Sequence, residues 1–359
     1  MYLGATDEKG LVTCITELVA NSIEQHLAGI CTAVSVTLHN DDSASVRDDG
    51  PGIRVTPIAG HDVPFLELSF TTFNSPRANH PFPVMGLAGV GAKCVNVLSE
   101  WMSVNTSWAN EEFQIVFEQG RVKEPLRKLT ESKILHGTLI RFKPDAEIFR
   151  QATFNSNKLA RILEQVAVLH PGLSVRFIDE RSNSENPALT AHFHFPNGAA
   201  DYLRRLDEPQ FKIHPEPVQI AGEHAGVKVA IAFQYIESMN TRILSFANSS
   251  LSPRGGTHVA GFLCGLADAV NQFAGPGGQR FEPHELRVGL TAIVSVWLKD
   301  LKYAGASRCE LINPEVESVV HKLTFEKVHA WIAELQGAHD WFIEQLDKQR
   351  SPNYGLGKE

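Results

Sequence analysis

The sequence lacks the features that mark secreted and membrane-spanning proteins. No apolar run approaches the ~20 residues that cross a bilayer, and the N-terminus has neither the basic nor the apolar segment of a signal peptide. The cysteines are far apart and include no Cys-x-x-Cys pair, which argues against a disulfide framework and a cysteine metal site: Cys14, Cys31, Cys94, Cys264 and Cys309. We therefore expect a cytoplasmic protein with no membrane partner.

Positive charge is also scarce. The chain has 33 Lys and Arg residues against 41 Asp and Glu residues, which gives a net charge of −8 at pH 7. A field of this sign does not attract nucleic acid, whose affinity for proteins depends mainly on phosphate neutralisation by basic side chains. Stable DNA binding is therefore not expected, although a local basic stripe is compatible with these numbers.

The length and the hydrophobic pattern predict two domains. A chain of 359 residues can form two packed cores, because single domains usually contain ~100–200 residues. Asp7 is placed to cap a helix over residues 9–27, and strand-like segments follow it. A change of composition near residues 205–216 predicts a boundary between two α+β domains, residues 1–205 and 206–359.

Two neighbouring segments suggest a ligand site in the first domain. Residues 61–85 are rich in Pro, Asn, Ser and Phe without clean periodicity, which predicts a flexible loop or lid. The next segment, "GLAGVGAKCVNVLSEW" over residues 86–101, predicts a glycine turn that leads into a helix. Such a turn can hold an anion, because unpaired N–H groups and the helix dipole point in the same direction.

Neither of the common phosphate-binding loops fits this glycine turn. Gly86 and Gly91 have the glycine spacing of the P-loop, Gly-x-x-x-x-Gly-Lys-Ser/Thr. However, Ala92 intervenes before Lys93, and Cys94 replaces the hydroxyl that would hold Mg²⁺. The dinucleotide fingerprint Gly-x-Gly-x-x-Gly is missing from the sequence.

Two further groups of residues could carry chemistry. Glu17 and Asn21 are i,i+4 neighbours on the first predicted helix, so they face the same side. A carboxylate there can accept a proton from water, and an amide oxygen can ligate Mg²⁺. In "DDGPG", Gly50 and Gly52 permit a tight turn, and Asp48 can accept a hydrogen bond from an exocyclic amine such as that of adenine. Taken alone, each group also fits a solvated helix face or an ordinary turn.

Taken together in this order, the motifs resemble the GHKL ATPase family and, within it, the gyrase B branch. The resemblance implies an α+β chain in which a GHKL α/β sandwich is followed by a ribosomal-S5-like transducer domain. The matching segments of the first domain are "MYLGATDEKGL", "ELVANSIEQHLAG", "VRDDGPGI", "GLAGVGAKCVNVLSEW" and "GTLIRFKPDAEIF". Those of the second domain are "RGGTHVAGF" and "LRVGLTAIVSVWLKDLKYAGASRCEL".

The resemblance implies a role for each matching residue, with ATP and Mg²⁺ as ligands. Glu17 matches the general base that activates the attacking water, and Asn21 matches the Mg²⁺ ligand. Asp48 matches the residue that binds the adenine amine. The other matches support the base or clamp the phosphates: Gly52 and Thr138 beside the aspartate, and Gly86, Gly89, Val90 and Gly91 at the phosphates.

The sequence departs from the family at two cations that would reach the phosphates. The Gln-Thr-Lys loop of the transducer corresponds to "ASR" over residues 306–308, so Arg308 keeps the positive charge and Ala306 drops the amide. Because arginine and lysine differ in reach and in donor geometry, phosphate contact is expected with an altered geometry. In the lid, Arg77 is a candidate to replace the family's lysine.

Further departures lie around the predicted base pocket. Pro51 stands where the family has an arginine, and Gln25 replaces its acidic neighbour on the first helix. Losing both charges together avoids a buried unpaired ion. We therefore interpret the change as an altered nucleotide site and not as a site that has been lost. Trp108 replaces an arginine at the pocket rim, which argues against aminocoumarin binding.

These comparisons with the family lead to one expected function and two alternatives. The chain starts and ends without the N-terminal dimerisation arm, the cleavage region and the DNA-binding tail of the family, so we expect a stand-alone ATP-hydrolysing protein that is not a complete topoisomerase and whose homodimer is weak. The first alternative is a GHKL phosphotransferase or ATP-dependent ligase that acts on a small molecule or peptide. The second is a regulatory protein that engages a partner when ATP binds.

Overall fold

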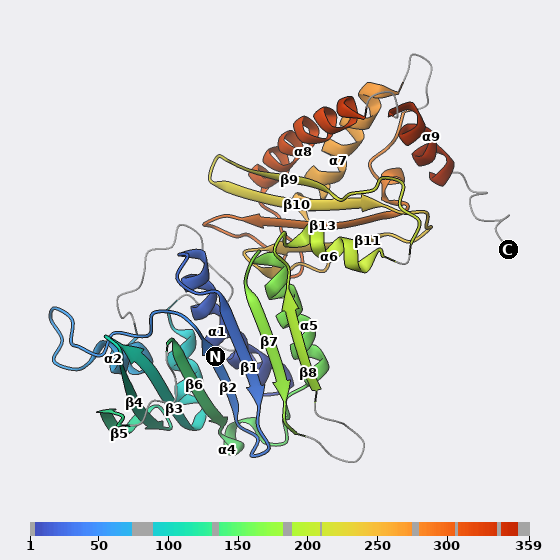
Figure 1. The fold of residues 1–359 in the computed structure, drawn as a ribbon. Helices are drawn as coiled ribbons and strands as arrows, with labels where there is room; N and C mark the ends of the chain where they lie inside the picture. Colours follow the sequence, from blue (N-terminus) through green and yellow to red (C-terminus); the bar gives the residue numbers. More distant parts are fainter. Residues whose placement is uncertain are drawn as a thin grey trace. The chain divides into compact units, whose positions relative to one another are not determined.

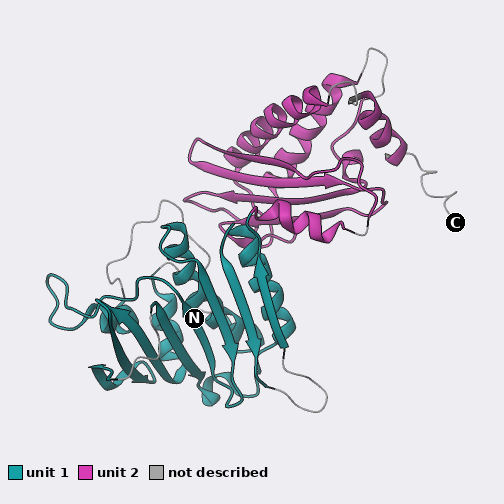
Figure 2. Ribbon diagram, in the orientation of Figure 1, with its two compact units in different colours: residues 1–80, 84–196 teal, residues 81–83, 197–359 magenta. Residues whose placement is uncertain are grey.

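The protein is described by a computed structural model that covers residues 4–73, 89–130, 136–181, 189–208, 210–274, 280–305, 308–335 and 339–350. The described residues up to Pro196 form one compact unit, and those from Asn197 onward form a second (Figure 2). The division falls earlier in the chain than the expected boundary between residues 205 and 206, because helix α6 (Ala199–Leu206) packs on strands of the second unit.

The first unit is built on one eight-stranded sheet (Figure 1). Its strands are β1 (Ala33–Leu38), β2 (Ala44–Asp48), β3 (Ser99–Trp108), β4 (Glu111–Glu118), β5 (Arg121–Lys128), β6 (Thr138–Pro144), β7 (Ser174–Asp179) and β8 (Leu189–His194). Its helices are α1 (Glu8–Leu27), α2 (Phe65–Thr71), α3 (Gly91–Val97), α4 (Ala146–Phe149) and α5 (Ser156–Leu169). The order across the sheet is β5-β4-β3-β6-β2-β1-β7-β8, with β1 antiparallel to β2 and parallel to β7.

Helix α1 forms where the sequence predicts it. The Asp7 side chain accepts hydrogen bonds from the backbone N–H groups of Lys9 and Gly10, which satisfies two of the donors that a helix start leaves open. The apolar face of the helix is at most 1% exposed and contacts β1 and β2: Leu11, Ile15, Leu18, Val19 and Ile23. Packing of this face fixes which side of α1 carries Glu17 and Asn21.

The predicted helix after the glycine turn is wrong in its second half. Helix α3 ends at Val97, and strand β3 begins at Ser99, so Trp101 lies in the strand. The Ser99 hydroxyl donates to the Val95 carbonyl and closes the last turn of the helix. Met102, Val104 and Thr106 are buried on one face of the strand, and Asn105 and Ser107 are buried on the other, so this part of β3 is covered on both faces.

The prediction of an irregular loop over residues 61–85 is wrong in part. Helix α2 occupies Phe65–Thr71, with Pro64 at its N-cap and three buried apolar side chains: Leu66, Leu68 and Phe70. The short helix is hard to recognise because seven residues give fewer than two full periods of the pattern. Residues 74–88, which include Arg77 and Gly86, lie outside the described residues.

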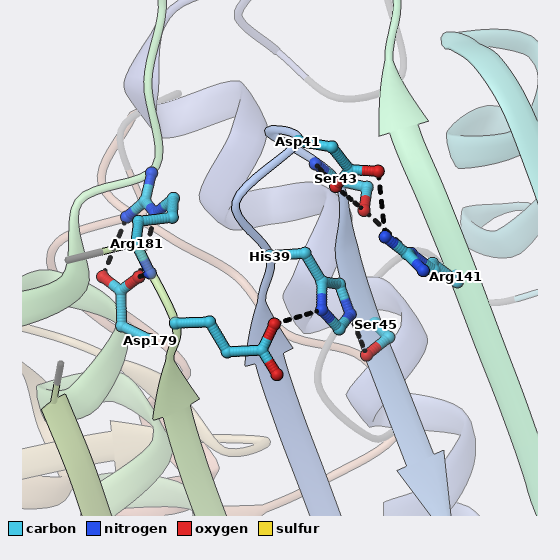
Figure 3. A network of polar contacts seen from close by, with 8 residues as sticks. His39, Asp41, Ser43, Ser45, Arg141, Asp179 and Arg181 are labelled. Atoms are coloured by element: carbon cyan, nitrogen blue, oxygen red, sulfur yellow. Dashed lines mark hydrogen bonds and ion pairs between the residues drawn. The ribbon is translucent and has the colours of Figure 1, made fainter.

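A network of polar side chains holds the turn that joins β1 to β2 (Figure 3). His39 lies between Glu180 and Ser45, at 2.8 Å and 2.9 Å from their oxygen atoms. The Arg141 guanidinium contacts Asp41 at 2.9 Å, and Arg181 contacts Asp179 at 2.9 Å. Because these contacts lie at the opposite end of β2 from Asp48, we assign them a structural role.

The second unit contains a five-stranded sheet and its own helices (Figure 1). Its strands are β9 (Val218–His224), β10 (Val227–Tyr235), β11 (Arg242–Ala247), β12 (Ser250–Leu251) and β13 (Leu290–Trp297), in the order β12-β11-β13-β10-β9. Besides α6, its helices are α7 (Thr257–Phe273), the 3-10 turn η1 (Glu285–Arg287), α8 (Pro314–Glu334) and α9 (His339–Arg350). No helix in the described part of the chain is both long and apolar enough to cross a membrane.

Glycines let α7 approach two neighbouring segments very closely. A Cβ at Gly261 would lie 2.3 Å from a backbone oxygen of α8. At the start of α7, the backbone pairs with the segment that follows Arg308: the N–H of Thr257 donates to the Leu311 carbonyl at 2.9 Å, and the N–H of Leu311 donates to Gly255 at 3.0 Å. The segment that carries Arg308 is thereby tied to α7.

We expect Gly256→Ala to lower the free energy of unfolding by about 2–4 kcal/mol. Gly256 has φ +123°, and an added Cβ would lie 2.0 Å from the Leu311 carbonyl oxygen, a backbone atom that cannot rotate away. Urea unfolding measures the change. The control is Gly226→Ala, at φ +74° with no atom within 4 Å, where only the backbone strain of about 1–2 kcal/mol remains. Equal losses in the two variants would contradict this assignment.

Candidate functional site

Three hydrogen bonds hold the side chain of Asp48 in the candidate site. It ends strand β2 and is 8% exposed. Its Oδ1 accepts hydrogen bonds from the backbone N–H groups of Gly50 at 3.0 Å and Thr138 at 3.1 Å, and its Oδ2 accepts one from the Ser22 hydroxyl at 3.2 Å. Burial raises the pKa of Asp48 in spite of these donors. The carboxylate is fixed in direction and keeps acceptor capacity for a further donor.

Two glycines near Asp48 allow close backbone approaches, one to β3 and one to Asp48 itself. Gly52 has φ +79°, and a Cβ there would lie 1.7 Å from the Ser107 carbonyl oxygen of β3. Gly137 has φ +91°, and a Cβ there would lie 1.9 Å from the carbonyl oxygen of Asp48 itself. Only glycine permits both the φ value and the approach. The structure therefore joins Thr138 to Asp48 by a hydrogen bond and places Gly52 against β3, and the roles of these residues toward a nucleotide stay predictions.

A pair of threonines completes this wall. Thr106 Oγ1 accepts a hydrogen bond from the backbone N–H of Ile53 at 2.7 Å and lies 3.4 Å from Thr138 Oγ1. Both threonines are at most 2% exposed. They fix the chain just after Gly52 against β3 and β6.

Glu17 lies where α1 meets the start of α3. Its side chain is 5% exposed, and a Cβ built on Gly91 would lie 1.9 Å from Glu17 Oε2. Gly91 is the first residue of α3, and Val90 is the N-cap. A carboxylate at this end of a helix is stabilised by the open N–H groups and the helix dipole. Glu17, Val90 and Gly91 thus form a second group. Of these residues, Glu17 belongs to α1, the helix that also contributes Ser22 to Asp48.

The lysine that a P-loop would use points elsewhere. Lys93 is 5% exposed and its ammonium donates to the Gly89 carbonyl at 2.8 Å. Gly89 has φ +77°, the left-handed region that favours glycine. Lys93 therefore stabilises the turn itself, which agrees with the failure of the P-loop pattern.

Asn21 is exposed and follows Glu17 by one helical turn. Its amide oxygen is a suitable ligand for Mg²⁺, which commonly takes one or two protein oxygens and completes its shell with water and substrate phosphates. Within the described residues, no group of three His, Cys, Asp or Glu side chains could hold a metal ion. The role of Asn21 as a Mg²⁺ ligand therefore stays a prediction.

Arg308 is exposed and belongs to the second unit. It has φ +53°, an uncommon backbone conformation for a residue with a side chain. Its proposed contact with a terminal phosphate stays a prediction, as does the role of Gly86, which lies outside the described residues.

Sequence reasoning missed several residues of the site. Ser22 follows Asn21 directly and donates a hydrogen bond to Asp48, a role that no motif of the sequence indicates. Gly137, which precedes Thr138 in "HGT", carries the same signal of close approach as the other glycines.

Cys14 packs near Glu17, and burial followed by the negative charge of Glu17 raises the pKa of Cys14 to about 12, so this thiol stays protonated.

Two family models match the chain, one in each unit. Residues 6–148 match the family described as "Histidine kinase-, DNA gyrase B-, and HSP90-like ATPase", and residues 198–350 match the family described as "DNA gyrase B". The first range contains Glu17, Asn21, Asp48 and the α3 turn. The second contains α7 and Arg308.

Known proteins match the chain across both units. The DNA gyrase B protein of Archaeoglobus fulgidus is 34% identical over 93% of this chain and 53% of its own length, and that of Thermotoga maritima is 34% identical over 91% and 53%. The crystal structure of the 43K ATPase domain of Thermus thermophilus gyrase B, solved with an aminocoumarin, superimposes with a TM-score of 0.83 at 29% identity, covering 99% of this chain and 92% of that one. The chain spans about half the length of the curated relatives it matches.

The fold and the site together define the class of the protein. Its first domain belongs to the GHKL ATPases, which implies binding and hydrolysis of ATP, and its second is a DNA gyrase B domain of the transducer type. The whole chain resembles the ATPase region of gyrase B and topoisomerase IV, and it is homologous to the N-terminal half of DNA gyrase B.

Proposed function

We propose that this chain by itself binds ATP with Mg²⁺ and hydrolyses it at the site on α1, β2 and α3. The observation that carries the proposal is the position of Glu17, whose buried carboxylate lies against Gly91 at the start of α3. A triphosphate held by the backbone of Gly89, Val90 and Gly91 would place its terminal phosphoryl group beside that carboxylate.

Each residue of the site has a distinct task in this mechanism. Asp48 accepts a hydrogen bond from the exocyclic amine of adenine, and Gly52 and Thr138 shape the pocket around the base. Glu17 accepts the proton of the attacking water. Asn21 would ligate Mg²⁺, which neutralises charge on the phosphate oxygens when bound. Arg308 would add a positive charge near the terminal phosphoryl group.

Experiments can distinguish simple hydrolysis of ATP from group transfer to an acceptor and from ATP-dependent binding of a partner. Release of ADP and phosphate by the purified chain with ATP and Mg²⁺ tests the proposed reaction directly. A phosphotransferase or ligase would form ADP mainly when an acceptor is added, and a regulatory protein would form an ATP-dependent complex with slow turnover. We propose a weak homodimer and no stable complex with DNA, which light scattering with a non-hydrolysable ATP analogue and a DNA-binding titration would measure. No binding of ATP by the folded chain would refute the proposed function.

We expect Asp48→Asn to weaken ATP binding by about 10-fold or more and yet to stabilise the protein without nucleotide. The affinity falls because a hydrogen bond to a charged acceptor is lost, while the Asn oxygen can still accept from Gly50 and Thr138. The free energy of unfolding rises by about 0.5–2 kcal/mol, because the variant no longer buries a charge in the folded state.

The pH dependence of stability gives the control. Since burial raises the pKa of Asp48 above its ordinary value of 3.8, the folded wild type holds more protons than the unfolded chain between these two values. The contribution of Asp48 to stability therefore decreases as the pH rises through this window. Thermal unfolding at several pH values should show the advantage of Asp48→Asn growing from acid to neutral pH. A variant that is less stable than wild type at neutral pH would contradict the argument.

A further inference from the structure

We propose that Gln25 is a second residue that recognises the base, and that its side-chain carbonyl selects a purine with an amino group at position 6. The inference rests on the proposed function, because it assumes that a nucleotide occupies the site. Gln25 lies on α1 two turns after Glu17, and its Oε1 atom is buried.

Gln25 and Asp48 both lie next to Gly50. A Cβ built on Gly50 would lie 1.8 Å from Gln25 Oε1 and 3.1 Å from Asp48 Oδ1. The glutamine amide thus occupies the space that a side chain at residue 50 would need. Both oxygens are acceptors, and they approach one another around Gly50.

The turn itself provides no donor for Gln25 Oε1. The N–H of Gly50 is already donated to Asp48, and Pro51 has no N–H group. Throughout the described residues, Gln25 Oε1 has no hydrogen-bond partner. A buried acceptor without a donor is unfavourable, so the site is improved by a ligand that brings an N–H group to this point.

The position of Gln25 along α1 matches the base end of the ligand. Glu17, Asn21 and Gln25 are spaced by four residues, so they follow one side of the helix. With a rise of ~1.5 Å per residue, Gln25 lies ~12 Å from Glu17 along the axis. If Glu17 faces the terminal phosphate and Asn21 the metal, Gln25 faces the base beside Asp48.

An exocyclic amine suits this pair of acceptors because it carries two hydrogens. One N–H is donated to Asp48 Oδ2, because Oδ1 already accepts from two backbone N–H groups, and the other is donated to Gln25 Oε1. A purine with a carbonyl at position 6 would instead bring a third acceptor to the same point, and its nearest N–H group would lie at position 1, away from the pair. The chain should therefore prefer ATP to its 6-oxo and 6-unsubstituted analogues, with Gln25 contributing to this preference.

The test compares nucleotides in two variants of the full chain. Isothermal titration with Mg²⁺ measures the affinities for ATP, for purine riboside triphosphate, which lacks the 6-amino group, and for inosine triphosphate. We expect Gln25→Met, which keeps the side-chain length without the amide, to reduce the preference for ATP over the 6-unsubstituted analogue by about 3- to 10-fold. Gln165→Met, a half-buried glutamine on α5, is the matched control and should leave the preference unchanged.

Gln25→Glu provides a second, independent measurement. It retains an oxygen acceptor at the same place, so the preference for ATP should remain. If ATP binds with an affinity that depends on Asp48 while Gln25→Met keeps the full wild-type preference, the role of Gln25 is refuted and the proposed function stands. If wild type binds none of the nucleotides, both proposals fail.

Discussion

Replacing Glu17 by glutamine should slow ATP hydrolysis by about 100- to 10,000-fold and leave ATP affinity within a few-fold of wild type. The expected range is that of a general base, since the glutamine keeps the size of the side chain but cannot accept the proton of the attacking water. The buried carboxylate beside Gly91 makes this the largest effect predicted for the site. Steady-state release of ADP and nucleotide titration measure the two quantities separately.

The control is a glutamate outside the site. Glu164 lies on α5, on a different helix of the same unit. Glu164→Gln should hydrolyse ATP at the wild-type rate. Normal turnover in Glu17→Gln would show that another group takes the proton, and loss of ATP binding would show that Glu17 is needed to form the site.

Gly91→Ala should reduce turnover by about 100-fold, through displacement of the same carboxylate. An added Cβ would lie 1.9 Å from Glu17 Oε2 and 3.0 Å from Glu17 Cβ, so a change of the outer rotamer alone does not relieve the contact. A misplacement on the order of 1 Å in a catalytic group can cost this much. Hydrolysis rates at saturating ATP measure the loss.

A double variant tests whether Gly91→Ala acts only by displacing the Glu17 carboxylate. If alanine at residue 91 acts through Glu17, the combination of Gly91→Ala with Glu17→Gln should be no slower than Glu17→Gln alone, because the carboxylate is already lost. Additive losses would instead assign Gly91 a role in holding the phosphates that is independent of the base.

Much of the first domain could be predicted because its signals are local. The cap at Asp7 and the apolar stripe of α1 locate the helix and its buried face without any tertiary information. The glycines at residues 50 and 52 mark a turn, and the structure places Asp48 beside it. The roles of these residues, however, came from the order of the motifs and their resemblance to a family, since each motif alone fits an ordinary surface.

The parts that were missed depend on contacts between distant segments. Apolar residues that continue past Val97 predict a helix that includes Trp101, and only pairing with β4 and β6 shows that a strand has begun. The Ser22 hydroxyl and Gly137 become important only when α1 and β6 meet Asp48. Tertiary contacts of this kind leave no periodic signal in the sequence.

The backbone pairing at Gly255 and Thr257 has a mechanical consequence for the second unit. Because backbone hydrogen bonds join the segment that carries Arg308 to the first turn of a helix of 17 residues, this segment cannot move independently of that helix. A force on Arg308 would pass to α7 and, across the close contact at Gly261, to α8. The two helices would then be displaced together when Arg308 is displaced.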